Sequence, residues 1–512
     1  MDRRKFLKGT ALVAGAMCVD LPLFSKAVKD FGKGNLKIGI LSDIHIKTVP
    51  SGKAKASWER FEKALRFYRS QNVDGVLIAG DMADDGTLWQ LKKVAEIWYS
   101  VFPDDKAPDG HKVEKLFIYG NHDIEAWKYS YMQKRPDLEE VKADALAKDR
   151  AASWKECFHE DWAPIYTKEI KGYKFIGGHF VNNKRMPGLD EYLKKEKLPK
   201  GKPFFYFQHC HPKGTCSAPW TWGQDNGEVT EILSNYPNCI AFSGHSHTPL
   251  VDERTIWQGG FVSVGTASLS YLVPFGGREN SKRFGDKSKT PSQMPEMPRD
   301  AHNGQLMTVY NDYITLERFD MERETPVGGN WIIPISSLTA RPSASGEAAA
   351  SGKASASLPP LSFEARAKKA VAPQFGPDTE VSITQALGAN RYKVEQEQIT
   401  VHFPTVKGGG KSVRAFDYEV QIEVQDVDVA KAVLTKRVYS NGYFKAASAE
   451  PDEAICVFGV SEIPTGVEYR FAVRPCECFG KKGEPIYSKW QTPVEAGSDE
   501  VGAPVQPGAE AK

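Results

Sequence analysis

The chain has 512 residues and a mass of 56.8 kDa, which is too long for one ordinary hydrophobic core, so at least two domains are expected. With 41% hydrophobic and 26% charged residues, the composition is that of a soluble globular protein. The formal net charge of +2 argues against a nucleic-acid-binding surface, because residues 1–27 supply the whole positive excess.

Residues 1–27, MDRRKFLKGTALVAGAMCVDLPLFSKA, have the order of an export signal. The pair Arg3 and Arg4 precedes a mildly apolar stretch from Ala11 to Val19, and the segment ends in the small-x-small sequence Ser-Lys-Ala. This order resembles the bacterial twin-arginine signal peptide, which implies a periplasmic or secreted protein. Elsewhere no apolar run reaches the roughly 18 residues of a membrane span.

Eight cysteines are present, and removal of the signal peptide would take Cys18 with it. The odd number that remains is not typical of a disulfide framework. Cys210 and Cys216 lie close together in the sequence, and both a disulfide and two buried thiols are compatible with their spacing.

The first half of the chain alternates apolar runs with helical patterns. The runs LKIGILSDIH and VDGVLIAGDMADD flank residues 54–71, which have helical periodicity, and residues 88–101 lead to a third run, KLFIYGNHD. Each run carries polar residues at its carboxyl end, as parallel strands of an α/β fold do. Further strands are predicted in YKFIGGHF, KPFFYFQHCHP, CIAFSGHSHTP and GGFVSVGTAS, and residues 302–320 predict a closing hairpin.

The second half has a different character. Residues 338–370 are rich in Ala, Ser and Pro and predict a linker, because they offer little apolar surface to bury. Residues 371–495 alternate apolar and polar residues in short runs, which predicts an all-β sandwich that resembles a fibronectin type III domain. Residues 496–512 predict a disordered tail.

Carboxylate, amide and imidazole side chains gather at the ends of the predicted strands. They are Asp43, His45, Asp81, Asn121, His122, Asp123, His209, His245 and His247. One such histidine alone would more often be an ordinary core or surface residue. An ordered set of ligand types on successive strand ends instead favours a metal site, because these ends meet at one edge of a sheet.

In chain order, the motifs DxH, GD, GNHD, H and GHxH resemble the signature of the calcineurin-like metallophosphoesterase superfamily. The motif set spans Asp43 to His247, and the resemblance implies a catalytic domain over residues 35–335. It also implies a four-layer α/β/β/α sandwich, with divalent metals held on loops at the strand ends. The expected fold is therefore this α/β domain followed by the all-β sandwich.

Asp81 is the natural bridge between two metals, because divalent cations about 3.5–4 Å apart repel each other and need a shared anion. The resemblance allots Asp43, His45 and His247 to the first metal site, and Asn121, His209 and His245 to the second. Oxygen and imidazole ligands without a thiolate suit Mn, Fe, Zn or Co, and the sequence does not choose among them.

By the same resemblance, His122 is a general acid that protonates the leaving oxygen and is not spent on coordination. Asp123 is expected either to orient His122 or to cap the turn. Gly120 is expected to permit a tight turn before them.

The sequence also makes predictions for other residues near the motifs. Asp84 stands where purple acid phosphatases of the superfamily place a metal-binding Tyr, which disfavours that subgroup. Asp84 and Asp85 are expected to be solvated or to cap the next helix, and His211 to face away from the site. Trp220 and Trp222 could stack on a substrate or simply pack their loop.

The sequence therefore predicts an exported dinuclear metal-dependent phosphoesterase, which hydrolyses phosphate diesters or monoesters by attack of a metal-bound hydroxide. Its substrate would be a small-molecule phosphate ester chosen by the loops, and no partner is indicated for the sandwich. The alternative is a surface binding protein with a vestigial phosphoesterase domain and a partner-binding sandwich. The intact ligand set argues against it.

Overall fold

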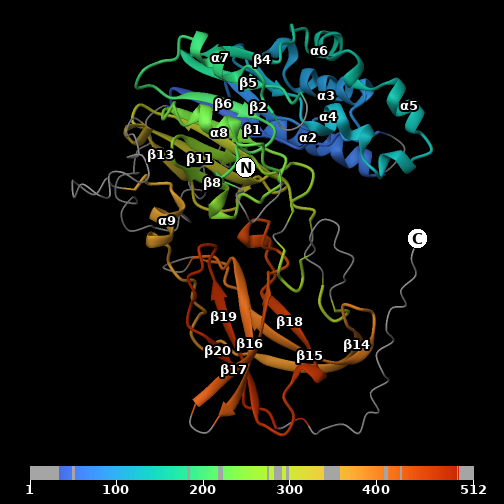
Figure 1. Ribbon diagram of the computed structural model, residues 1–512, viewed down its shortest axis with the longest axis vertical. Helices are drawn as coiled ribbons and strands as arrows, with labels where there is room; N and C mark the ends of the chain where they lie inside the picture. Colours follow the sequence, from blue (N-terminus) through green and yellow to red (C-terminus); the bar gives the residue numbers. More distant parts are fainter. Residues whose placement is uncertain are drawn as a thin grey trace, which may run out of the picture.

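The computed structural model describes residues 34–48, 52–181, 185–216, 223–273, 276–281, 291–295, 299–338, 358–408, 413–426, 429–492 and 494. The predicted signal peptide and the predicted tail lie outside these residues. Within the described ranges, no helix is long and apolar enough to cross a membrane. Figure 1 shows an α/β part at the top and an all-β part below it.

The first sheet has seven strands and is built around three parallel ones. It runs in the order β12 (Thr325–Pro326), β11 (Tyr313–Asp320), β10 (Asn303–Val309), β1 (Leu36–Leu41), β2 (Gly75–Ala79) and β3 (Glu114–Ile118), with β13 (Trp331–Pro334) paired to β11. Strands β1, β2 and β3 are parallel, so their carboxyl ends meet at one edge. Strands β10 and β11 form the predicted antiparallel hairpin.

The second sheet has six strands in the order β4 (Ile165–Ile170), β5 (Tyr173–Gly178), β6 (Phe204–Gln208), β7 (Cys239–Ser243), β9 (Val262–Gly265) and β8 (Ile256–Gln258). Its four central strands β5, β6, β7 and β9 are parallel. The four later apolar runs of the sequence supply β5, β6, β7 and β9, as predicted.

Helices cover the outer face of each sheet. They are α2 (Gly52–Ser70), α3 (Leu88–Val101), α4 (Asn121–Glu125), α5 (Leu138–Ala143), α6 (Arg150–Phe158), α7 (Leu189–Lys195) and α8 (Glu228–Leu233). Helix α3 begins after Thr87, whose hydroxyl accepts the N–H of Gln90 at 3.3 Å and caps the helix. This cap fixes the helix at the end of the loop that follows β2.

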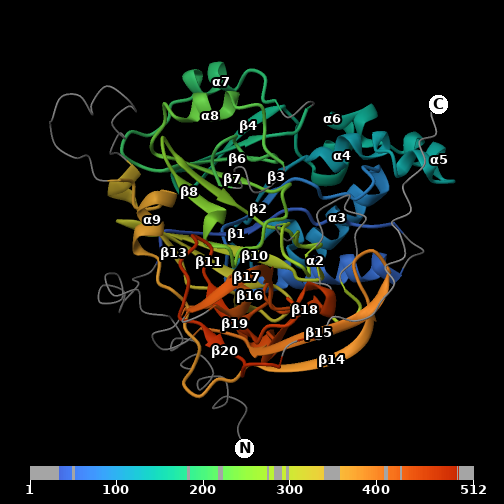
Figure 2. The same cartoon turned by 60° about the horizontal axis from the view of Figure 1, so that its bottom comes forward.

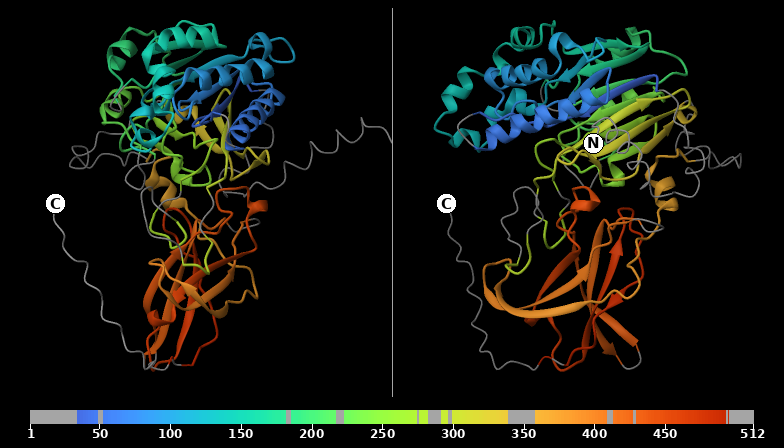
Figure 3. Two further views of the ribbon diagram at one scale, coloured as in Figure 1. Left: turned by 90° about the vertical axis from the view of Figure 1, so that its right-hand side faces the viewer. Right: turned by 180° about the vertical axis from the view of Figure 1, so that it is seen from behind.

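Apolar side chains separate the layers. Leu65 of α2 and Trp98 of α3 belong to one core cluster with Phe117 of the first sheet, and Leu193 of α7 packs with Tyr206 of the second. A third cluster fills the space between the two sheets. The result is the predicted α/β/β/α sandwich, seen from two further sides in Figure 3.

The C-terminal part is an all-β sandwich. One sheet has β14 (Ser382–Ala389), β15 (Glu395–Pro404) and β18 (Glu453–Gly459), and the other has β17 (Val429–Val438), β16 (Asp417–Asp426), β19 (Tyr469–Cys476) and β20 (Ile486–Tyr487). Val401 and Phe458 of the first sheet pack with Val420 and Phe471 of the second. Figure 2 views this sandwich with its lower end turned toward the reader.

The structure differs from the predicted linker at its C-terminal end. Residues 339–357 lie outside the described ranges, but α9 (Phe363–Lys369) follows them within the predicted linker of residues 338–370. The Ser362 hydroxyl caps α9, and the Arg366 guanidinium binds the Glu253 carboxylate of the α/β part. The sequence did not predict this seven-residue helix or the contact of Arg366, because the composition of the whole segment is dominated by small residues.

Candidate metal centre

All nine predicted site residues follow the carboxyl ends of strands of the two sheets, six of them on loops and three, Asn121, His122 and Asp123, in the short helix α4. Asp43 and His45 follow β1, Asp81 follows β2, Asn121, His122 and Asp123 follow β3, His209 follows β6, and His245 and His247 follow β7. Every one of them is largely buried, with His122 the most exposed. The two sheets therefore deliver these side chains to one place.

The ligand atoms come together in three groups, and within each group they lie within 4.8 Å of one another. The groups are Asp43 with His45 and His247, Asp81 with His209 and His245, and His45 with Asp81 and His122. The first group has the three residues that the resemblance allots to one metal, and the second joins Asp81 to His209 and His245, two of the three allotted to the other. Carboxylate oxygens and imidazole nitrogens at this spacing suit divalent transition metals.

Asp81 lies between these groups. Its Oδ2 is 3.1 Å from His209 Nε2 and 3.8 Å from His45 Nε2. Its Oδ1 accepts the backbone N–H of His122 at 2.8 Å. One carboxylate oxygen is thus held by the backbone while the other faces ligands of both predicted sites, which is the position that a bridging carboxylate needs.

The imidazole rings are turned so that Nε2 faces the cluster. Nδ1 of His209 lies 2.7 Å from the carbonyl oxygen of Ala79, and Nδ1 of His247 lies 2.7 Å from that of Tyr271. A carbonyl oxygen can only accept, so Nδ1 carries a proton in each ring and Nε2 is the nitrogen that faces the carboxylates. Such outer contacts are how proteins fix metal-binding histidines.

Nε2 of His45 and Oδ1 of Asn121 are among the buried polar atoms of the cluster that have no hydrogen-bond partner. The Asn121 amide is oriented by its other end, because Nδ2 donates to the Tyr129 hydroxyl at 2.5 Å. Leaving a buried acceptor unsatisfied costs about 1–3 kcal/mol, and a cation would remove that cost at both atoms. The residues present therefore fit divalent metals.

The backbone at the cluster is strained. Five of the predicted ligands have positive φ angles, namely Asp43 (51°), His45 (49°), Asp81 (51°), His245 (64°) and His247 (53°). Residues other than Gly rarely adopt this left-handed region, and each costs on the order of 1 kcal/mol. The surrounding hydrogen bonds stabilise these conformations, which aim the side chains inward from the sheet edge.

Glycines make room for the carboxylates. A Cβ at Gly120 would overlap Asp81 Oδ1, and a Cβ at Gly244 would overlap Asp43 Oδ2. Gly120 has a φ of −103°, which other residues also adopt, so its backbone conformation does not require glycine. It is required because the Asp81 side chain packs directly against its Cα.

The carboxylates of the cluster are strongly acidic. Burial raises the pKa of Asp43, but the imidazoles of His247 and His209 outweigh burial and lower the pKa to about 2. The pKa of Asp81 is likewise held below its usual range, where His209 and His122 oppose the effect of burial. Burial also lowers the pKa of His45, which keeps its ring neutral. Anionic carboxylates beside a neutral imidazole are ready for a cation.

The predicted contact between Asp123 and His122 is absent. The Asp123 carboxylate accepts the N–H groups of Ala83 at 2.7 Å and Gly120 at 2.7 Å, so it ties the loop after β2 to the loop after β3. Nδ1 of His122 instead lies 2.8 Å from the carbonyl oxygen of Asp84. These bonds to backbone amides are the ones that a turn-capping carboxylate makes.

Asp84 and Asp85 are also different from the prediction. Oδ1 of Asp84 lies 3.0 Å from His45 Nδ1, so Asp84 orients a predicted ligand rather than facing solvent. Asp85 is buried and pairs with Arg135 at 2.9 Å. His211 belongs to none of the three groups, as predicted, and lies 2.9 Å from the Ser246 hydroxyl.

Three tyrosines near the cluster carried no signal in the sequence. The Tyr271 ring lies 4.3 Å from the His247 ring, and the Tyr129 ring lies 5.3 Å from the His122 ring. Tyr131 is 6.1 Å from Tyr129 and half exposed. Trp220 and Trp222 lie outside the described residues. None of the seven described cysteines, Cys210 and Cys216 included, is in a disulfide bond.

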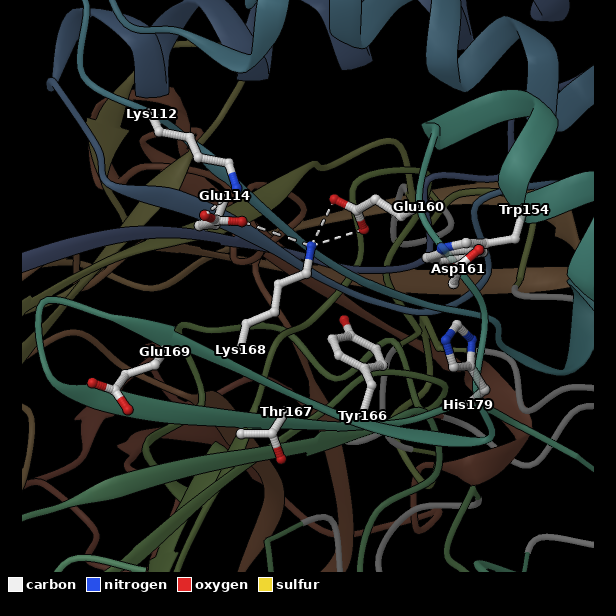
Figure 4. A pocket seen from close by; sticks show the side chains of 10 residues that line it. All are labelled: Lys112, Glu114, Trp154, Glu160, Asp161, Tyr166, Thr167, Lys168, Glu169 and His179. Atoms are coloured by element: carbon white, nitrogen blue, oxygen red, sulfur yellow. Dashed lines mark hydrogen bonds and ion pairs between the residues drawn. The ribbon is translucent and has the colours of Figure 1, made fainter.

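A cavity of about 430 Å³ lies beside β3, the edge strand of the first sheet, and is separate from the metal cluster. Figure 4 shows Lys168 at its centre between Glu114 and Glu160. Lys168 is 2.8 Å from Glu160, and the Tyr166 hydroxyl donates to the carbonyl oxygen of Phe117 at 2.7 Å. These side chains of β4 thus close the free edge of β3.

His179 lines this cavity and supports the loop after β3. Its Nδ1 accepts the N–H of Tyr119 at 3.0 Å, two residues before Asn121. Burial, with a smaller contribution from Arg150, lowers the pKa of His179 to about 3. The folded protein therefore holds this ring neutral, with its lone pair used on the backbone.

Acid is expected to destabilise the protein through His179. An unfolded histidine has a pKa of about 6.5, so below that pH the unfolded chain binds the extra proton and stability falls toward pH 3. The loss is at most about 1.4 kcal/mol per pH unit. A His179→Asn variant, whose amide oxygen can still accept from Tyr119, should lose less stability between about pH 7 and pH 5 in urea unfolding. Equal losses in the two proteins would contradict this role.

Comparison with known proteins agrees with the geometry. Residues 36–249 match the family model for calcineurin-like phosphoesterases. These residues form a calcineurin-like phosphoesterase domain. The matched range contains all nine residues predicted from the motifs, and no protein with a curated description matches the sequence.

Solved structures resemble the phosphoesterase domain at low sequence identity. A dimetal phosphatase from Danio rerio is 12% identical, with a TM-score of 0.33, and the match covers 59% of this chain and 99% of that one. A purple acid phosphatase from yellow lupin seeds is 12% identical, with a TM-score of 0.39, over 58% of this chain and 53% of that one. The site assignment rests on this chain's own side chains.

Proposed function

We propose that the protein is an exported, dinuclear metal-dependent phosphoesterase that hydrolyses phosphate diesters or monoesters. The observation that carries the proposal is the convergence of six of the seven predicted ligands into two groups, one of which contains Asp81, whose carboxylate also faces His45 of the other. Membership of residues 36–249 in a phosphoesterase family supports the reaction class. The arginine pair and apolar stretch of residues 1–27 support export to the periplasm or beyond.

Two divalent cations, when bound, would supply a nucleophilic water near neutral pH and would neutralise charge on the phosphoryl group. Asp43, His45 and His247 would hold one cation, and Asn121, His209 and His245 the other. Asp81 would bind both. Mn, Fe, Zn and Co all suit this donor set.

His122 is the proposed proton donor. A ring nitrogen of His122 lies in the group formed with His45 and Asp81, and the Nδ1 proton is directed at the carbonyl oxygen of Asp84, which leaves Nε2 for the substrate. Nε2 can therefore give up a proton only when the ring is an imidazolium, after which the ring returns to the tautomer that the carbonyl favours. Asp123 would act by holding the loops after β2 and β3 together.

The C-terminal sandwich is proposed to be fibronectin type III-like. Its division into sheets of three and four antiparallel strands supports this. A binding protein with a vestigial phosphoesterase domain is the second candidate, but a decayed enzyme would have no reason to keep strained ligands on five positive-φ positions.

Turnover of two chromogenic esters tests the proposal. The mature chain, reconstituted with Mn²⁺, is expected to hydrolyse bis-(p-nitrophenyl) phosphate, p-nitrophenyl phosphate or both, and the ratio of kcat/KM values identifies the ester class. An Asp81→Asn protein is the blank for contaminating phosphatases. Two bound metals without hydrolysis of either ester would favour the binding-protein candidate.

A further inference from the structure

The connection between β9 and β10, residues 266–302, supports the first predicted metal site from behind. The backbone N–H of Ser270 donates to the Asp43 carbonyl oxygen at 3.1 Å, and the Ser268 hydroxyl donates to the same oxygen at 3.1 Å. Asp43 is one of the positive-φ ligands, so these two bonds help to hold its strained backbone.

The same stretch also holds His247. The carbonyl oxygen of Tyr271 lies 2.7 Å from His247 Nδ1, and the N–H of Val273 donates to the His247 carbonyl oxygen at 3.0 Å. The Tyr271 ring lies 5.9 Å from the ring of His45. Residues 268–273 thus contact all three members of the first group, Asp43, His45 and His247.

A few residues later, the connection binds the C-terminal sandwich. The buried Asn280 side chain donates to the Tyr439 carbonyl oxygen at 2.8 Å and accepts the Tyr439 N–H at 3.0 Å. Arg278 pairs with the fully buried carboxylate of Asp417 at 2.6 Å. The side chain of Met294 lies in the sandwich core.

In Figures 1 and 3 the described parts of the connection, coloured yellow-green, lie between the α/β part and the sandwich. The two parts also share a hydrophobic cluster, in which Phe416 and Tyr443 of the sandwich part join Leu250 and Ile256 of the phosphoesterase domain. The sandwich is therefore a packed neighbour of the domain and not a tethered spacer.

We infer that the C-terminal sandwich positions the first metal site, through Asn280 and Arg278 acting on residues 268–273. This inference rests on the proposed function. Without its contacts to the sandwich, the connection would be a long loop with many accessible conformations. Ordering that loop costs conformational entropy, and only its hydrogen bonds to Asp43 and His247 would offset this cost. The second site, built on Asp81, Asn121, His209 and His245, receives none of the contacts named above.

Calorimetric titration of the metal-free, full-length mature protein with Mn²⁺ tests this coupling. Asn280→Ala is expected to weaken one of two Mn²⁺ sites about tenfold and to leave the other unchanged, since outer contacts of ligands are worth about 10–100-fold in metal affinity. Ser268→Ala should weaken the same site from the other end of the connection. His247→Ala and His209→Ala proteins identify which step of the isotherm belongs to which site.

Lys436→Gln is the matched control. Lys436 pairs with Glu462 at 2.6 Å and donates to the Val457 carbonyl oxygen, and both partners lie within the sandwich. Its replacement therefore perturbs the sandwich but removes none of the contacts of the connection named above. Unchanged affinities in Asn280→Ala, or an equal loss at both sites, would overturn the inference. A wild-type protein that binds fewer than two Mn²⁺ would instead refute the proposed function.

Discussion

Replacing Asp81 with asparagine is expected to remove both metals from the protein and to lower kcat by about 10³-fold or more. The Asp81 carboxylate faces His209 at 3.1 Å and His45 at 3.8 Å, so one negative charge serves both predicted sites. Asparagine keeps the shape, and its amide oxygen can still accept the N–H of His122. It then turns an N–H₂ toward the ligands, which cannot bind a cation and cannot screen two of them from each other. Metal content by plasma mass spectrometry and turnover of the preferred nitrophenyl ester are the measurements.

Asp84→Asn is the matched control for Asp81→Asn. Asp84 stands three residues later on the same loop and contacts His45 only through Nδ1, on the side away from the cluster. Its variant should keep two metals at saturating concentration and show at most about a 10–100-fold weaker first site. If Asp81→Asn retained both metals, or behaved like Asp84→Asn, Asp81 would not be the bridge.

The sequence was sufficient to predict where the site lies. Polar residues that end apolar runs, such as Asp43 after β1 and His209 after β6, must lie at the carboxyl edge when the strands are parallel. That edge is common to both sheets, so nine residues far apart in the chain converge. Local pattern carries this information because strand direction and side-chain type are both visible in short stretches.

Roles that depend on side-chain reach between loops could not be predicted. Asp84 and Asp123 are both carboxylates beside motif residues, yet one orients His45 and the other binds backbone amides of two loops. The spacing of residues along the chain does not predict which residue of another loop comes within about 3 Å of a given side chain. Tyr129, which fixes the Asn121 amide, lies eight positions away with no motif around it.

The relation between the two parts of the chain was equally hidden. Alternating patterns predicted the sandwich, but Asn280 and Arg278 stand in a stretch without periodicity. Their role follows from their contacts with Tyr439 and Asp417, which only the structure shows. Contacts between residues more than a hundred positions apart are set by tertiary packing, and a single sequence does not display them. The packing of the sandwich against the α/β part therefore had no local signal in the sequence.

Replacing His122 with asparagine is expected to leave both metals bound and to lower kcat most for esters with poor leaving groups. A general acid contributes about 10²–10⁴-fold when the leaving oxygen needs a proton, and little when the leaving group is a stable anion such as p-nitrophenolate. His122 suits this role because its ring lies beside His45 and Asp81 and its Nδ1 proton is engaged by the Asp84 carbonyl, so Nε2 is the nitrogen left for proton transfer. A series of aryl and alkyl esters of graded leaving-group pKa measures the effect, and the variant should show the steeper dependence.

Metal content decides between the two roles that the geometry allows His122. Its ligand atom lies within 4.8 Å of those of His45 and Asp81. If His122 coordinated a metal, it would therefore be a ligand of the first metal site, which His45 and Asp81 share. Loss of a metal in His122→Asn, with an equal fall in kcat for every leaving group, would make His122 a ligand. Two retained metals with a leaving-group-dependent fall in kcat would leave proton donation as its role. A lost proton donor slows an ester with an alkoxide leaving group more than one with a phenolate, because the alkoxide needs the proton more.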